Sequence, residues 1–242
     1  MDAELWSVLA GSYVLGSVPS AFLAGKWSRG IDIRRHGSGN VGATNLMLFT
    51  SRRAVIPVIV FDSIKGMLAI VIAWRIGLGL GGQTLAGLAA IIGHNWPCLL
   101  RFQGGRGVIT TLGVSFFLPL INRSVPLLVL SLVGLGFGAL ALFTAHFKRL
   151  PLGVFLIVAL FPLFGWFIAH SLSLTLGYLG MFGLMVVRRL TAPQPIKVTS
   201  ISRKQVLLNR LFFDRDLRDK EAWMSIVLEQ QENQRRLAET RE

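Results

Sequence analysis

The chain alternates between long runs of apolar residues and short polar segments rich in glycine and arginine. A helix needs about 20 residues to cross roughly 30 Å of hydrocarbon. The apolar residues follow one another and do not alternate with polar ones, as they would in strands with one face in lipid. The pattern predicts an all-α polytopic membrane protein with seven transmembrane helices, at residues 4–25, 54–74, 84–100, 108–121, 125–147, 151–169 and 172–187. Three of these runs are short, and dividing the second half differently gives six helices instead.

Composition agrees with a membrane protein. Of 242 residues, 52% are hydrophobic and only 15% charged, with a mean hydropathy of +0.59, whereas soluble domains have about 25% charged residues. The two prolines of "TAPQPIK" end the last apolar run. We therefore divide the chain into a seven-helix membrane domain at 1–190 and an amphipathic helical tail at 191–242. The apolar residues of the tail either lie along the membrane surface or pack against the protein itself: Leu207, Leu208, Leu211 and Phe212.

Basic residues predict the orientation, because cytoplasmic loops carry an excess of Lys and Arg. One set of alternate loops holds twelve of them: Lys26, Arg29, Arg34, Arg35, Arg52, Arg53, Arg101, Arg106, Lys148, Arg149, Arg188 and Arg189. The other set holds only Arg75 and Arg123. We predict an N-terminus outside and a cytoplasmic C-terminus, which requires an odd number of spans. No nucleic-acid-binding motif accompanies the net charge of +13. We expect contact with membrane lipids and no nucleic-acid partner.

A first polar segment, "GSGNVGATN" at 37–45, follows the first apolar run. Glycine adopts positive φ and exposes its amide, so such a segment can form a concave nest of N–H donors that suits phosphate or carboxylate. Arg34, Arg35 and His36 directly precede it. The alternative is an ordinary turn, since Gly, Ser and Asn are common in turns.

A second segment, "RFQGGRGVITT" at 101–111, lies on the same predicted side and joins Gly-Gly-x-Gly to Arg106 just before a helix. Helix N-termini attract anions. The segment is not a Walker motif, because no Gly-Lys-Ser/Thr follows. Two such segments on one face predict binding of two phosphates or of one large anion.

Asp62 and Lys65 lie three residues apart within the second apolar run, and therefore on one helix face. Ionisable residues in a membrane span are usually functional or paired, so either they neutralise each other or they serve the anion site. The sequence contains no cluster of His, Cys and carboxylates with metal-ligand spacing. No metal or other cofactor is expected.

The motifs "GSVPSAF", "DIRRHGSGNVGATN", "DSIKG" and "GHNWPCLLRFQGGRGV" occur in order over residues 11–113. Together they resemble the bacterial acyl-phosphate:glycerol-3-phosphate acyltransferase family, PlsY. The resemblance implies a multi-pass protein of the bacterial plasma membrane whose active site faces the cytoplasm. It also implies transfer of a fatty acyl group from acyl phosphate to the 1-hydroxyl of glycerol 3-phosphate, which gives lysophosphatidic acid and phosphate without a covalent enzyme intermediate.

The resemblance also implies site residues. Ser38, Asn40 and His94 are the catalytic candidates. The glycine-rich loop with Arg106 corresponds to the family's site for the phosphate of glycerol 3-phosphate. The substrate-binding candidates are Arg35, Gly37, Gly39, Thr44, Asn45, Lys65, Gly104, Gly105, Arg106 and Gly107.

Three departures from the family pattern matter. Leu48 replaces an Arg, Gln103 and Arg106 replace lysines, and an Arg-His-x-x-Asn motif after the last span is absent. One hypothesis is that Arg52 or Arg53 and the Asn209-Arg210 pair act as substitutes. The alternatives are a divergent relative with a different phosphorylated acceptor or no activity, and a non-enzymatic anion-binding membrane protein.

Overall fold

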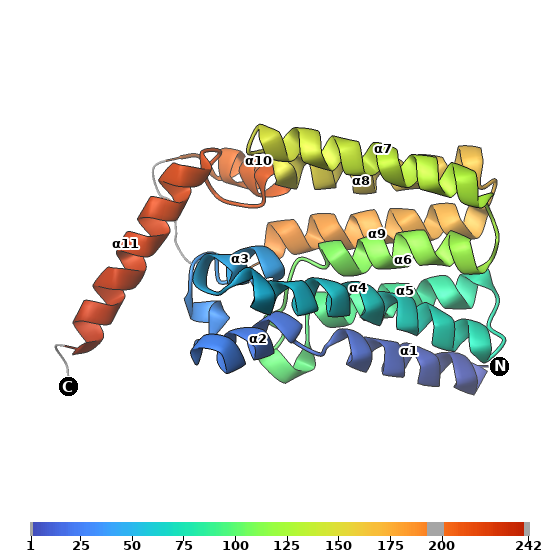
Figure 1. The fold of residues 1–242 in the computed structure, drawn as a ribbon, viewed down its shortest axis with the longest axis horizontal. Coiled ribbons are helices and arrows are strands. Elements are labelled where there is room, and N and C mark those ends of the chain that lie inside the picture. The colour runs from blue at the N-terminus through green and yellow to red at the C-terminus, as the bar shows by residue number, and fades with distance from the viewer. Residues whose placement is uncertain (1, 193–200, 240–242) are drawn as a thin grey trace.

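The computed structural model describes residues 2–192 and 201–239, and every regular element in this part of the chain is helical. Its long helices run side by side as a bundle (Figure 1): α1 (Asp2–Gly16), α4 (Arg52–Arg75), α5 (Leu80–Asn95), α6 (Val108–Ile121), α7 (Leu127–His146), α8 (Leu150–Leu163) and α9 (Leu172–Thr191). The shorter elements are α2 (Ser20–Arg29), η1 (Ile33–Arg35), α3 (Ala43–Phe49), η2 (Cys98–Leu100) and the π-helical turn η3 (Phe164–Ile168). The tail forms α10 (Arg203–Phe213) and α11 (Lys220–Glu239).

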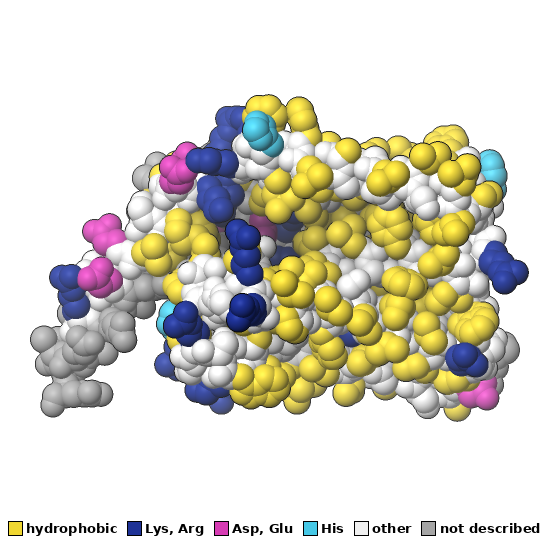
Figure 2. Space-filling view, viewed as in Figure 1, with side chains coloured by type: hydrophobic (Ala, Val, Ile, Leu, Met, Phe, Trp, Pro, Cys, Tyr) yellow, Lys and Arg dark blue, Asp and Glu magenta, His cyan; other side chains and the backbone are white. Residues whose placement is uncertain are grey.

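The outer surface of the bundle is largely apolar, and hydrophobic side chains cover most of the face seen in Figure 2. On α7, Leu128, Leu135 and Leu142 are 70% exposed or more. Among the described residues, four helical segments are long and apolar enough to cross a membrane: Ala3–Arg29, Arg52–Arg75, Leu127–His146 and Leu150–Ile168. The prediction of an all-helical membrane protein is confirmed to this extent. The number of seven spans and their orientation stay predictions.

Two of the predicted spans end earlier than expected. The run at 4–25 is two helices, because Pro19 has no N–H and disfavours helical backbone at Val18, and α1 ends at Gly16. The run at 84–100 ends as a helix at Asn95, two residues before Pro97. As a result α2 and the segment after Asn95 leave the bundle at one end, which we call the loop end, while the N-terminus lies at the other (Figure 1).

The largest core packs around α9. Tyr178 is 0% exposed, stacks on Phe161 of α8 and donates a hydrogen bond from its hydroxyl to the Ser115 carbonyl of α6 at 3.0 Å. Ile91 of α5 belongs to the same buried cluster. Helices α4, α5, α6, α8 and α9 thus form a packed frame, and their ends fix the polar segments at the loop end.

Candidate active site

Both glycine-rich segments lie at the loop end and contact each other. The Gly105 amide donates a hydrogen bond to the His94 carbonyl at 3.1 Å. A Cβ built on Gly105 would lie 2.7 Å from the Val41 carbonyl oxygen of the first segment. Both segments and the break between α1 and α2 line a cavity of about 10 Å³, which is roughly the volume one water requires. The structure thus brings together the two segments that the sequence predicted to share a face.

Asn45 shapes the first segment. Its Nδ2 donates to the carbonyls of His36 at 2.9 Å and Asn40 at 3.2 Å, and its Oδ1 accepts from the Ser38 amide at 3.0 Å. The residue is 2% exposed. Asn45 therefore fixes the turn of the loop from its buried side. Its side chain is hydrogen-bonded, as buried polar groups in proteins generally are. Direct contact between Asn45 and a substrate stays a prediction.

Ser38 and Asn40 lie on the half-buried part of this loop. Gly37 and Gly39, with φ of 54° and 69°, adopt the left-handed conformation that favours glycine. Ser38 Oγ accepts from the Asn40 amide at 3.4 Å. Asn40 Oδ1 is buried and has no hydrogen-bond partner among the described residues, so the loop retains an unused polar atom.

The two arginines before this loop, Arg34 and Arg35, differ in how available their guanidinium groups are to a ligand. Asp32 accepts hydrogen bonds from the Arg34 guanidinium at 2.7 and 3.0 Å, and these bonds hold the pKa of Asp32 below its ordinary value. Arg35 is exposed, as is Thr44 at the start of α3. Arg35 is therefore the better placed of the two arginines to meet an anion from solution.

Arg188, in the last turn of α9, holds the second segment in place. Its Nε donates to the Gly105 carbonyl at 2.8 Å and its Nη2 to the Gly104 carbonyl at 2.7 Å. The guanidinium lies over the Trp96 ring, 5.5 Å from its centroid, and the residue is 3% exposed. Sequence reasoning counted Arg188 only as an orienting charge. The predicted span ended at 187, whereas α9 continues through Arg188 and Arg189 to Thr191.

The glycine-rich part of the second segment ends where α6 begins. Gly107, with φ of 69°, turns the chain into the helix, and a Cβ there would lie 2.4 Å from Asn95 Oδ1. The amides of Arg106, Gly107 and Val108 have no hydrogen-bond acceptor in the described part of the chain. Asn95 is 0% exposed, and its side-chain N and O have no partner among those residues either. Free amides at a helix N-terminus are what phosphate binding requires.

A buried ionic cluster lies beneath the loops. Asp62 Oδ1 is 2.9 Å from Lys65 Nζ, accepts a hydrogen bond from Ser20 Oγ at 2.7 Å, and is 3.6 Å from His94 Nδ1. Of the two alternatives for Asp62 and Lys65, the mutual pairing is observed, and the Lys65 side chain is 1% exposed. His94 Nε2 faces Gly105. Roles for Lys65 and His94 toward a substrate stay predictions.

The tail packs on the bundle through α10. Phe212 meets Phe155 of α8 with ring centroids 5.4 Å apart, and Arg189 of α9 donates to the Leu211 carbonyl at 2.6 Å. Leu207 and Leu208 remain 41% and 39% exposed. Of the two alternatives for the tail, packing against the protein itself is therefore observed for Phe212.

The proposed Asn209-Arg210 substitute is engaged by neighbouring residues of the tail and by the Leu190 carbonyl of α9, which accepts from Arg210 Nη1 at 3.3 Å. Asn209 Nδ2 donates to the Asp216 carbonyl at 2.8 Å, and Arg210 Nε to the Asp216 carboxylate at 2.5 Å. Within the described part of the tail, Asp214 reaches the glycine-rich segment and pairs with Arg106. No local pattern could have indicated a contact between residues 108 positions apart. Near Leu48, which is 50% exposed, both candidate arginines are also exposed: Arg52 and Arg53.

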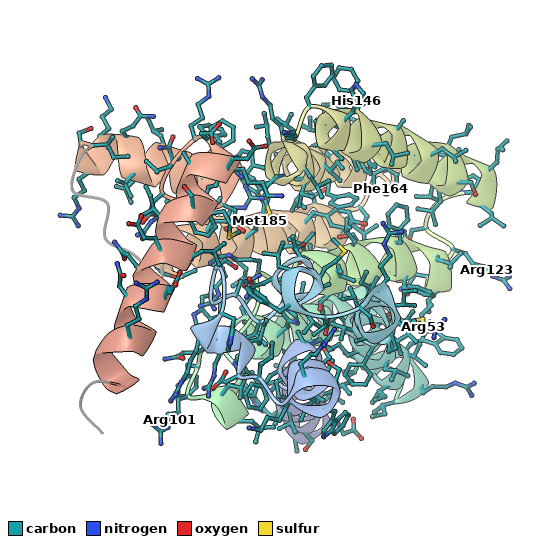
Figure 3. The ribbon with its side chains drawn as sticks, turned by 60° about the vertical axis from the view of Figure 1, so that its left-hand side comes forward. Arg53, Arg101, Arg123, His146, Phe164 and Met185 are labelled. Carbon is teal, nitrogen blue, oxygen red and sulfur yellow. The ribbon has the colours of Figure 1, made fainter. Side chains whose placement is uncertain are left out.

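Basic side chains surround a hollow at the loop end (Figure 2). Figure 3, in which this end comes forward, shows Arg101 projecting from it and Arg123 projecting from the far end. Arg106 and Arg188 lie inside the same end, at 9% and 3% exposure. The arrangement combines cations, free amides and an apolar outer surface, which suits an anionic substrate carrying a lipid chain.

Comparison with known proteins agrees with this chemistry. The family model described as "Glycerol-3-phosphate acyltransferase" matches residues 6–195. "Glycerol-3-phosphate acyltransferase 4" of Dehalococcoides mccartyi (strain CBDB1) is 40% identical over 224 residues, which cover 90% of this chain and 92% of the relative. The glycerol-3-phosphate acyltransferase of Trichlorobacter lovleyi is 39% identical over 183 residues, which cover 74% of this chain and 87% of the relative.

Solved structures show the same fold. The glycerol 3-phosphate form of PlsY, described as an integral membrane glycerol 3-phosphate acyltransferase, aligns with a TM-score of 0.64 and 26% identity. The alignment covers 77% of this chain and 88% of that one. A second PlsY structure, the lysophosphatidic acid form, aligns over 92% of this chain and 99% of that one with a TM-score of 0.67 and 24% identity. The chain belongs to the glycerol-3-phosphate acyltransferase family.

Proposed function

We propose that this acyltransferase uses acyl phosphate as its donor and glycerol 3-phosphate as its acceptor. The 1-hydroxyl oxygen of the acceptor attacks the carbonyl carbon of the mixed anhydride, and the bond from that carbon to the phosphate oxygen breaks. The proton that the hydroxyl loses goes to the departing phosphate, and lysophosphatidic acid and phosphate leave. Since the anhydride is already activated, positioning and charge stabilisation supply the catalysis. No covalent enzyme intermediate is needed.

The observation that carries the proposal is the set of free amides beside Arg106 at the start of α6. A phosphate there would accept from the amides of Arg106, Gly107 and Val108 and face the Arg106 guanidinium. Asn95, whose buried amide has no partner among the described residues, borders the same position. We assign this position to the phosphate of glycerol 3-phosphate, with Gly104 and Gly105 forming the preceding turn.

We place the reacting carbonyl at the first loop. In this arrangement Ser38 and Asn40 donate hydrogen bonds to the oxyanion that develops on the carbonyl oxygen, and His94 lies under the adjoining Gly105. Asp62 faces the Nδ1 of His94. The remaining proposed substrate contacts surround this point: Arg35, Gly37, Gly39, Thr44, Asn45 and Lys65. The acyl chain extends into lipid along the apolar outer surface.

The donor can be tested directly. We expect purified full-length protein to release lysophosphatidic acid from glycerol 3-phosphate with acyl phosphate, and not with acyl-CoA or acyl carrier protein, because only the mixed anhydride has a phosphate leaving group for the cations of the loop end. Product is followed by mass spectrometry. Turnover with a thioester alone would refute the donor assignment. A folded protein that uses none of the three donors would favour the divergent relative without this activity.

We further propose seven spans in the bacterial plasma membrane, with the site facing the cytoplasm and the tail at 191–242 on the same side. The basis is the twelve-to-two distribution of basic residues. We expect a reporter fused after Glu242 to give a cytoplasmic signal and one inserted between Gly77 and Gly82 to give an external signal. The reverse pair of signals would contradict the orientation, and two signals on one side would contradict the odd number of spans.

A further inference from the structure

Asp214, which follows α10 directly, forms a partly buried ion pair with Arg106. Arg106 Nε donates to Asp214 Oδ2 at 3.0 Å and lies 2.9 Å from Oδ1. The side chains are 8% and 23% exposed, respectively. Both contacts use the Nε of Arg106, and its two Nη nitrogens have no partner among the described residues. A guanidinium has five N–H donors, so four of them remain available.

The backbone of Asp214 has a conformation that glycine adopts more readily. Its φ of 58° and ψ of 31° place it in the left-handed region, at the position that ends α10. Helices commonly end there with glycine, since a Cβ is disfavoured in this conformation. A residue kept in such a conformation must be held by its surroundings. At Asp214 the surrounding contacts are the ion pair with Arg106 and a hydrogen bond from the Asp214 amide to the Arg210 carbonyl at 3.0 Å.

Several contacts fix Asp214 relative to the loop. Arg189 of α9 donates to the Leu211 carbonyl at 2.6 Å and to the Pro151 carbonyl at 2.8 Å, which ties α10 to the bundle. On the other side of Asp214, Asp216 pairs with Arg210. The end of α10 is therefore anchored to the bundle, and it places the carboxylate of Asp214 beside Arg106.

We propose that Asp214 is a positioning residue for the acceptor site. It holds the Nε edge of Arg106, so that the Nη nitrogens face the phosphate of glycerol 3-phosphate in a fixed orientation. The inference rests on the proposed function, in which Arg106 binds that phosphate. Fixing the side chain before binding removes a cost that the substrate would otherwise bear, since immobilising one long side chain reduces affinity by about 2- to 12-fold.

The test compares Asp214→Asn and Asp214→Gly with the wild-type full chain. We expect the KM for glycerol 3-phosphate to rise about tenfold in both, while the KM for acyl phosphate stays unchanged. Asp214→Gly suits the left-handed backbone, so its thermal midpoint should not fall. A rise in KM without a loss of stability separates positioning from general support of the fold. The matched control is Glu221→Gln, because Glu221 forms an exposed ion pair with Lys148 and not with a residue of the glycine-rich segments.

A double-mutant cycle decides how Asp214 acts. We expect Arg106→Gln to raise the KM for glycerol 3-phosphate, and Asp214→Asn to have no further effect in that background. An unchanged KM in Arg106→Gln would refute the phosphate site itself. A raised KM there with an unchanged KM in Asp214→Asn would refute only the positioning role. A lower KM in Asp214→Asn would also refute it, because Asp214 would then compete with the phosphate for Arg106.

Discussion

Replacing Gly105 by alanine is expected to reduce acyl transfer by about 100-fold or more. A Cβ at this position would lie 2.1 Å from His94 Nε2 and 2.7 Å from the Val41 carbonyl oxygen, whereas nonbonded carbon atoms pack at about 3.5–4.0 Å. The His94 ring cannot readily move aside, because its other nitrogen faces buried Asp62. Val41 contributes backbone, which cannot rotate away. The loop must therefore shift, and a displacement of about 1 Å can cost about 100-fold in rate.

The measurement is kcat and KM for glycerol 3-phosphate, with thermal unfolding in detergent recorded in parallel. Gly183→Ala is the matched control, since Gly183 lies exposed on α9 and a Cβ there meets no atom within 4 Å. We expect the control to keep wild-type kinetics and Gly105→Ala to remain folded with little activity. Wild-type kinetics in Gly105→Ala would mean that the contact between the two glycine-rich segments does not shape the site.

Replacing Arg188 by methionine is expected to have an effect of similar size. The change leaves the carbonyls of Gly104 and Gly105 without the donors that now lie at 2.7 and 2.8 Å. Hydrogen bonds to charged groups contribute about 1.5–3 kcal/mol each, and contributions within one cluster are not additive. Even a single such bond at the upper end corresponds to about 150-fold in rate. We expect kcat/KM to fall by about 100-fold or more.

Arg188→Lys should recover little of this loss, because a guanidinium donates to two carbonyls at once through a rigid fork while an ammonium is a single point charge. Arg75→Met is the control, since Arg75 is exposed on the far end of α4 and its loss should leave kcat/KM within twofold, that is, within about 0.4 kcal/mol. The fraction of folded protein is measured by size exclusion. If activity falls only in proportion to the folded fraction, Arg188 supports the bundle and not the loop.

Local features of the sequence were sufficient to predict much of this protein. A run of apolar residues is helical in a membrane because the backbone must satisfy its own hydrogen bonds there. The structure accordingly has helices close to the predicted ranges, such as α4 at Arg52–Arg75 and α7 at Leu127–His146. The common helix face of Asp62 and Lys65 follows from their spacing of three residues, and the structure shows that the two side chains pair there. The two glycine-rich segments could be recognised as loops because the backbone preferences of glycine depend only on neighbouring residues in each segment.

The tertiary structure decided which charged side chains contact the glycine-rich loops. Arg188 is indistinguishable in sequence from an arginine that orients a helix, and only the packing of α9 against the frame carries it to the carbonyls of Gly104 and Gly105. Asp214 meets Arg106 because α10 folds back onto α8 and α9. The sequence determined the membrane helices and the glycine-rich loops because hydropathy and backbone preference act over neighbouring residues. The contacts of buried charges depended on the tertiary structure because they join helices distant in the chain.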